Sequence, residues 1–179
     1  MKAGWFDRFG AARDVIKIGE QPTPNAAHGE VLVRLETSGV NPSDVKKRAG
    51  AFPNLLDNGH VIPHSDGAGV IEATGEGVPE SRVGERLCLY QDQLDSTVGT
   101  DEEYIALDAS RAITLPDNTD FATGACLGIP AMTAHRCVYS DGDIDGQLVL
   151  VTGGAGRVGS SASQWAKMGG GKVIGTPRN

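Results

Sequence analysis

LVLVTGGAGRVG, residues 148–159, is the stretch that decides the fold of the chain. Its apolar run stops at Thr152 and enters a turn in which the glycines at 154, 156 and 159 fit the pattern G-x-G-x-x-G. Glycines in such a turn permit a tight bend, a close approach of the backbone to a pyrophosphate, and close packing of the next helix. The N-terminus of that helix offers free N–H groups and the positive end of a dipole to phosphate oxygens. We therefore predict a dinucleotide site formed by these turn residues: Gly153, Gly154, Ala155, Gly156, Arg157, Val158 and Gly159.

The residues that follow the turn predict the rest of a βαβ unit. Val158, Ala162, Trp165 and Ala166 fall on one face of a helix, and three glycines at 169–171 end it. Residues 172–176, KVIGT, then predict a second strand. An open doubly wound sheet needs further strands and helices to bury both of its faces. We therefore expect that the sequence ending at Asn179 is a truncated form of such a domain.

Composition and charge narrow the class of protein. The chain has 179 residues, of which 39% are hydrophobic, and no apolar run approaches the roughly 20 residues of a membrane span. Its start lacks the apolar core of a signal peptide, so we expect a cytoplasmic protein. Residues 51–125 hold three basic and fourteen acidic residues, which argues against a nucleic-acid partner. The three cysteines, at 88, 126 and 137, are expected to be reduced and mostly buried.

The first two thirds of the chain predict a different architecture. Val31, Val33 and Leu35 alternate with other residues as in a strand that has one buried face. Further short strands are predicted near 70–71, 87–90, 104–107 and 112–115, separated by glycine and proline turns. This pattern indicates a small β-rich barrel over residues 1–115. Helices are predicted at 44–50, 121–127 and 133–139.

Five patches occur in the order found in the medium-chain dehydrogenases/reductases. They are GEVLVR (29–34), SGVNPSD (38–44), DGAGV (66–70), GIPAMTAHR (128–136) and the glycine turn at 153–159. The chain most resembles the zinc-free branch, of the zeta-crystallin type of NADPH:quinone oxidoreductase. The resemblance implies an α+β region followed by an α/β region. The first is a GroES-like catalytic and substrate domain over 1–120, and the second is an incomplete Rossmann NADP-binding domain over 121–179.

The same resemblance bears on metal binding. Zinc-dependent members place a cysteine where Asn41 stands and a His-Glu pair where Ser65 and Asp66 stand. Asparagine and serine are poor ligands for zinc, which prefers thiolate and imidazole. His64 lies one residue from the ligand position and is interpreted as a loop histidine. No metal is therefore expected.

The resemblance also implies which residues contact the cofactor and substrate. Asn41 would lie near the nicotinamide and the substrate, or would only shape its loop. Lys46 stands where the zeta-crystallin pattern has a tyrosine, and would donate to an oxyanion, contact a cofactor phosphate, or remain solvated. The end of the second strand holds Thr176 and Arg178 and no acidic residue, which favours NADPH over NADH unless Arg178 is simply solvated. Arg157 either helps to neutralise phosphate or points to solvent.

Three functions remain open from the sequence. The first is reduction of quinones or conjugated enones by hydride transfer from NADPH without zinc. The second is an enoyl-thioester reductase or another zinc-free member of the superfamily. The third is a catalytically incompetent fragment that acts only as a binding or structural module. In each case the expected partner is a small molecule, with neither nucleic acid nor membrane, and the parent protein is expected to form a homo-oligomer.

Overall fold

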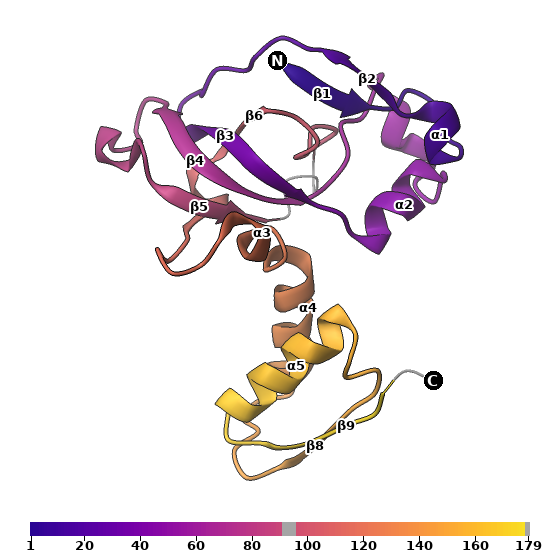
Figure 1. Cartoon of the computed structure of the whole chain (residues 1–179), viewed down its shortest axis with the longest axis vertical. Helices are drawn as coiled ribbons and strands as arrows, with labels where there is room; N and C mark the ends of the chain where they lie inside the picture. Colours follow the sequence, from indigo (N-terminus) through magenta and orange to yellow (C-terminus); the bar gives the residue numbers. More distant parts are fainter. Residues whose placement is uncertain (91–95, 178–179) are drawn as a thin grey trace. The chain divides into compact units, whose positions relative to one another are not determined.

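The computed structural model describes residues 1–90 and 96–177 of the chain (Figure 1). The chain divides into two compact units, Met1–Gly128 and Ile129–Asn179, which we call the first and the second unit. The helices and strands of the first unit are β1 (Lys2–Trp5), α1 (Ala12–Val15), β2 (Lys17–Glu20), β3 (Glu30–Gly39), α2 (Pro42–Arg48), β4 (Asp66–Thr74), β5 (Arg86–Leu89), β6 (Tyr104–Asp108), β7 (Ala112–Thr114) and α3 (Phe121–Gly124). They are joined by short 3-10 helices at Pro53–Leu56, Glu80–Arg82 and Ala109–Arg111. The second unit holds most of α4 (Gly128–Tyr139), then β8 (Leu148–Val151), α5 (Arg157–Met168) and β9 (Lys172–Gly175).

The first unit is built on a five-stranded antiparallel sheet with the order β6-β3-β4-β5-β7. Successive side chains of a strand point to opposite faces, so Val31 and Val33 on β3 point into the same core and are fully buried. They pack with Ile71, Leu87, Leu89, Ile105, Leu107 and Ala112. Full burial of each such side chain contributes about 1.5–3 kcal/mol. The predicted β-rich first domain is thus confirmed.

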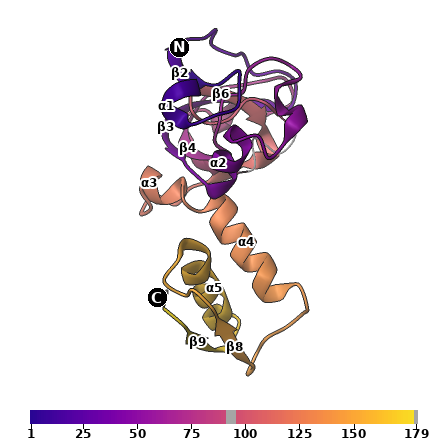
Figure 2. The ribbon, with the colours of Figure 1, turned by 90° about the vertical axis from the view of Figure 1, so that its right-hand side faces the viewer.

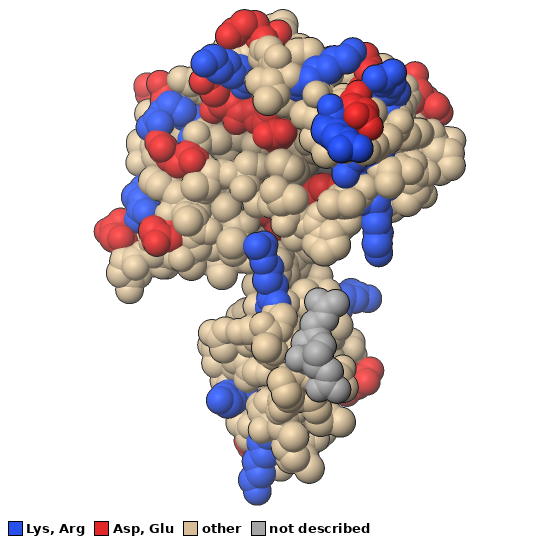
Figure 3. Space-filling model, turned by 45° about the vertical axis from the view of Figure 1, so that its right-hand side comes forward, with Lys and Arg blue, Asp and Glu red and all other residues tan. Residues whose placement is uncertain are grey.

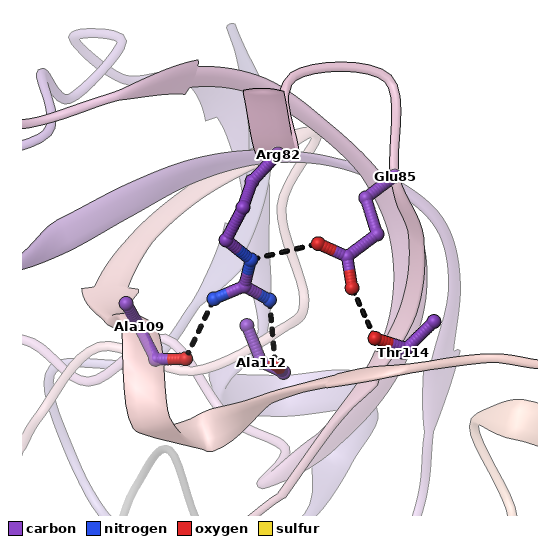
Figure 4. Close-up of polar contacts among 5 residues, drawn as sticks. All are labelled: Arg82, Glu85, Ala109, Ala112 and Thr114. Atoms are coloured by element: carbon purple, nitrogen blue, oxygen red, sulfur yellow. Dashed lines mark hydrogen bonds and ion pairs between the residues drawn. The ribbon is translucent and has the colours of Figure 1, made fainter. Parts of the chain in front are cut away.

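Arg82 links separate segments of the chain at the edge of this sheet. Arg82 Nε donates to Glu85 Oε2 at 2.7 Å, and its two terminal nitrogens donate to the carbonyl oxygens of Ala109 (3.1 Å) and Ala112 (2.9 Å) (Figure 4). Thr114 donates to the other oxygen of Glu85. One guanidinium therefore joins the turn before β5 to the segment that leads into β7.

The second unit is a parallel βαβ unit. β8 and β9 pair in parallel, and α5 lies along one face of them (Figure 2). Val151 and Ala162 are buried in that contact, with Trp165 packed against them. Leu148, Leu150 and Ile174 are exposed, because they alternate with the residues that face α5. The predicted order of strand, turn, helix and strand is present.

Two expectations from the sequence are wrong in detail. Helix α4 begins at Gly128 rather than at 133, because Pro130 lies in its first turn, where a missing N–H removes no helical hydrogen bond. The cysteines are free, but Cys126 and Cys137 are exposed and Cys88 is half-buried. Cys88 alternates with Leu87 and Leu89, which fill the core, so its side chain points to the other face of β5.

The surface of the chain carries charges of both signs. Figure 3 shows acidic and basic side chains interspersed over the face of the first unit that it displays. No helix in the described part of the chain is long and apolar enough to cross a membrane.

Candidate functional site

The glycine turn between β8 and α5 leaves no room for a side chain at Gly159. A Cβ added to Gly159 would overlap the carbonyl oxygen of Gly153 and lie 2.9 Å from the Cα of Gly154. Gly153 itself has a φ of 67°, in the left-handed region that favours glycine. A Cβ on Gly154 would lie 3.3 Å from the Cα of Gly175. The turn therefore presents bare backbone, as a close approach by a pyrophosphate requires.

The N-terminus of α5 adds hydrogen-bond donors to this turn. Gly156 precedes the helix without a side chain that caps it, and the N–H of Ser160 is bonded to the carbonyl oxygen of Gly156 at 2.7 Å. The N–H groups of the first helical residues, Arg157, Val158 and Gly159, come before the regular helical bonding pattern begins. Donors of this kind, at the positive end of a helix dipole, suit phosphate oxygens. The residues present thus fit the pyrophosphate of a dinucleotide.

Thr176 contacts the turn directly. Its carbonyl oxygen accepts from the N–H of Gly154 at 2.9 Å, and its hydroxyl oxygen accepts from the N–H of Gly153 at 3.2 Å. Two of the turn's N–H groups are thereby used inside the protein, and the N-terminus of α5 is left as the main anion site. The predicted role of Arg178 lies outside the described residues.

Asn41 lies in the first unit, in the loop between β3 and α2, and is 4% exposed. Its side-chain Nδ2 donates to Asp66 Oδ2 at 2.8 Å, and its backbone N–H donates to Asp44 Oδ2 at 2.6 Å. The second bond closes the first turn of α2. Lys46 follows on α2 with an exposed side chain. Asn41 and Lys46 therefore share one segment of the first unit, whereas the glycine turn belongs to the second.

The carboxyl group of Asp44 is buried beside Asn41. Burial raises its pKa, while the N–H of Asn41 and the nearby His64 oppose that change. Its other oxygen, Oδ1, and the hydroxyl of Ser43 are buried without a hydrogen-bond partner among the residues that the structure describes. Buried polar groups are usually bonded, so such atoms are typical of functional sites and of water-binding positions.

Four further residues near Asn41 were not selected from the sequence. Asp66, at 1% exposed, binds the Asn41 amide. Ser38 Oγ lies 2.9 Å from His64 Nδ1 and 2.7 Å from Thr100 Oγ1, and Thr100 donates to the backbone oxygen of Asp66 at 2.6 Å. Ser38 and Thr100 also line a hollow of about 310 Å³ on the first unit. The partners are up to 62 residues apart, so no local pattern identifies them. The only local feature of the sequence that could have pointed to His64 is its position between a proline and a serine in a glycine-rich loop.

Residues 1–90 and 96–177 contain no group of three or more His, Cys, Asp and Glu side chains placed to hold a metal ion. Asn41, Ser65 and Asp66 stand where zinc-dependent members of the family have zinc ligands. In this chain the Asn41 amide donates to the Asp66 carboxylate, and Ser65 is buried.

An antiparallel β-domain followed by a glycine-turn βαβ unit places the chain in the class of the medium-chain dehydrogenases/reductases. Comparison with known proteins supports this. The alcohol dehydrogenase GroES-like domain family matches residues 27–117, and the chain belongs to this family.

Individual relatives are oxidoreductases. The chain is 34% identical over 166 residues to a quinone oxidoreductase of Rattus norvegicus, covering 91% of this chain and 49% of the relative. It is 31% identical over 172 residues to a 2-methylene-furan-3-one reductase of Solanum lycopersicum, covering 93% and 44%. A mycobacterial protein solved in complex with NADPH superposes with a TM-score of 0.83 at 30% identity, covering all of this chain and 53% of that one. The chain thus spans about half the length of the curated relatives it matches.

Proposed function

We propose that the chain serves the reduction of quinones or conjugated enones by NADPH, without zinc. The observation that carries the proposal is the bare glycine turn at the uncapped N-terminus of α5. Two of the relatives reported above support the acceptor class, since one is named a quinone oxidoreductase and the other a furanone reductase. The NADPH complex of the mycobacterial protein supports the cofactor.

In this proposal residues 121–179 bind the cofactor and residues 1–120 bind the substrate. The N–H groups of Arg157, Val158 and Gly159 would hold the pyrophosphate, and the Arg157 guanidinium would add positive charge. Thr176 would hold the turn in shape through its two hydrogen bonds. NADPH, when bound, supplies the hydride. Preference for NADPH over NADH, and a part for Arg178 in it, stay predictions.

Asn41 would orient the reacting groups. One hydrogen of its Nδ2 is held by Asp66, so the amide cannot rotate freely, and its Oδ1 and second N–H keep a fixed direction. A quinone or enone delocalises the negative charge that hydride addition creates, so its reduction does not require a Lewis acid. The amide of Asn41 and the hydroxyl of Ser65 are weak donors to zinc, which favours the zinc-free reaction. Lys46 is exposed and free to reach an oxyanion or a phosphate.

A fluorescence titration of the 179-residue chain with NADPH tests the cofactor site. We expect saturable binding, and a loss of about 10-fold or more in affinity for Gly159→Ala, because its Cβ would overlap the Gly153 carbonyl. Gly175→Ala is the matched control, because its Cβ would meet nothing closer than 4.0 Å and its φ is not positive. Equal affinity for NADPH in all three proteins would contradict the assignment of the glycine turn.

Turnover separates the remaining functions. Consumption of NADPH with a naphthoquinone or a cyclic enone supports the proposal, and consumption only with an enoyl thioester supports the second function. Binding of NADPH without consumption of any acceptor would identify the chain as a binding module. The cytoplasmic location, the homo-oligomeric parent and the absence of a nucleic-acid partner stay predictions.

A further inference from the structure

The backbone holds His64 in an unusual conformation. Its φ of 77° makes it the one non-glycine residue with a positive φ in the described part of the chain. This region is unfavourable for a residue with a Cβ, and such residues concentrate at functional sites. Thr100 N–H donates to the backbone oxygen of His64 at 3.0 Å, and Asp101 N–H donates to that of Pro63 at 3.1 Å. The neighbouring segment therefore enforces the position of the imidazole.

The direction of three hydrogen bonds fixes which nitrogen of His64 carries a proton. The backbone oxygen of Asp66 can only accept, so the single hydroxyl proton of Thr100 points to it. The Ser38 hydroxyl must then donate to Thr100 Oγ1, at 2.7 Å. Ser38 has no second proton, so it accepts from His64 Nδ1, at 2.9 Å. Nδ1 therefore keeps its hydrogen in every protonation state, and Nε2 is the nitrogen that gains and loses a proton.

Acidic groups on two elements interact with His64. Asp44, on α2, and Asp101, in the segment before β6, are each attracted to His64. Burial raises the pKa of both carboxyl groups, and the attraction to His64 partly opposes it. Ser38, at the end of β3, contacts the same imidazole. A half-buried histidine with one anchored nitrogen and one exchanging nitrogen has the arrangement of a general acid.

We propose that His64 supplies the proton that the acceptor takes up after hydride transfer. This inference rests on the proposed function. Addition of the hydride converts a quinone to a hydroquinone monoanion, or an enone to an enolate. The anion then takes the Nε2 proton of the imidazolium, which leaves neutral His64 with its hydrogen on Nδ1. Solvent returns a proton to Nε2, so one acceptor, one NADPH and one proton give the reduced acceptor and NADP⁺.

Nitrogen NMR of the ¹⁵N-labelled chain tests the position of the proton without any need for turnover. In the neutral form of His64 we expect a protonated Nδ1 and a bare Nε2. His28 is exposed and serves as the internal comparison, with the more common Nε2–H form. Ser38→Ala removes the acceptor and should abolish the Nδ1–H preference of His64. A bare Nδ1 in the unsubstituted chain would overturn the proposal.

His64→Gly tests the transfer of the proton. Glycine accepts a φ of 77°, so we expect this variant to fold, with the backbone strain at residue 64 relieved. Its turnover with a naphthoquinone should fall about 100-fold, the lower part of the range for general acid catalysis. Added imidazole should restore at least part of that loss, because the removed side chain leaves room for it. The His28→Gln variant should have the same turnover as the original chain, and added imidazole should not change it.

The outcomes separate this proposal from the one on which it rests. An unsubstituted chain that never oxidises NADPH refutes the proposed function, and the role of His64 with it. An active chain whose His64→Gly variant is equally active refutes the role of His64 alone. A loss of turnover that imidazole does not restore assigns His64 a packing role and also overturns the inference.

Discussion

Arg82→Ala should destabilise the first unit, because one guanidinium holds three separate groups. It donates to the Glu85 carboxylate and to the carbonyl oxygens of Ala109 and Ala112 (Figure 4). Glu85 is bonded in turn to Thr114 on β7. Truncation at residue 82 would leave two carbonyls and one carboxylate without these donors, at the edge of the sheet where only three residues of β7 pair with β5.

The magnitude follows from the number and exposure of the lost bonds. Hydrogen bonds to charged groups contribute about 1.5–3 kcal/mol each when buried. The Arg82 and Glu85 side chains are 23% and 20% exposed, so water replaces part of the loss. We expect a decrease of about 2–4 kcal/mol in the free energy of unfolding for Arg82→Ala. Arg82→Lys keeps the charge but not the planar fork of donors, and about half of that loss should remain.

Urea unfolding measures this effect in a Trp165→Phe background. Trp5 is then the only tryptophan, and it lies in β1 of the first unit. Arg13→Ala is the control, because the Arg13 side chain is 90% exposed, and we expect a change within about 0.5 kcal/mol. A loss of less than about 0.5 kcal/mol for Arg82→Ala would refute the argument that this arginine fastens the sheet.

The same network predicts a dependence on pH. The hydrogen bond from Arg82 lowers the pKa of Glu85 below its ordinary value of 4.5. A lowered pKa in the folded state contributes stability above the ordinary value, and that stability is lost as pH falls through the folded pKa. Arg82→Ala should therefore show a smaller loss of stability on acidification below pH 4.5 than the original chain. Equal acid sensitivity of the two proteins would contradict this cause.

Three further changes test the site. Asp66→Ala should lower NADPH-dependent turnover about 10-fold or more by releasing the Asn41 amide, whereas Asp66→Asn keeps an acceptor and should retain more activity. Asp44→Asn should stabilise the first unit at pH 7. Because the pKa of Asp44 is raised in the folded state, the stability of the first unit is greatest at low pH and declines as pH rises through that pKa. Urea unfolding of the two proteins at pH 7 measures the difference in stability. Thr176→Val removes one of two bonds to the glycine turn and should cost the second unit about 1 kcal/mol, read from Trp165 fluorescence.

The sequence predicted well what depends on neighbouring residues. The alternation of Val31 and Val33 follows from the two-residue repeat of a strand, and both are buried on one face. The glycine turn is recognisable because a Cβ at Gly159 would overlap the Gly153 carbonyl oxygen, and because Gly153 has a positive φ that favours glycine. Such constraints act within a few residues, so they leave a mark in the local sequence.

The parts that the sequence did not predict depend on distant contacts. Ser38 and Thr100 are 62 residues apart, and Asn41 and Asp66 are 25 apart, so neither pair leaves a periodic pattern. Residues 148–151 are all apolar, yet Leu148 and Leu150 are exposed, since α5 covers only one face of β8 and β9. When every residue of a strand is apolar, the sequence does not show which face of the strand is covered by another element.

The pair formed by Asn41 and Asp66 gives the strongest link between sequence and site. A carboxylate that is 1% exposed is costly unless it is bonded, so Asp66 needs a donor at that position. Asn41 supplies one through Nδ2, which a cysteine at the same place would not do. Gly128 lies against the same carboxylate so closely that a Cβ would overlap Oδ1, which leaves little freedom for Asp66 to move away. The residues that distinguish this chain from the zinc-dependent pattern thus depend on each other. The Asn41 amide owes its fixed direction to this dependence.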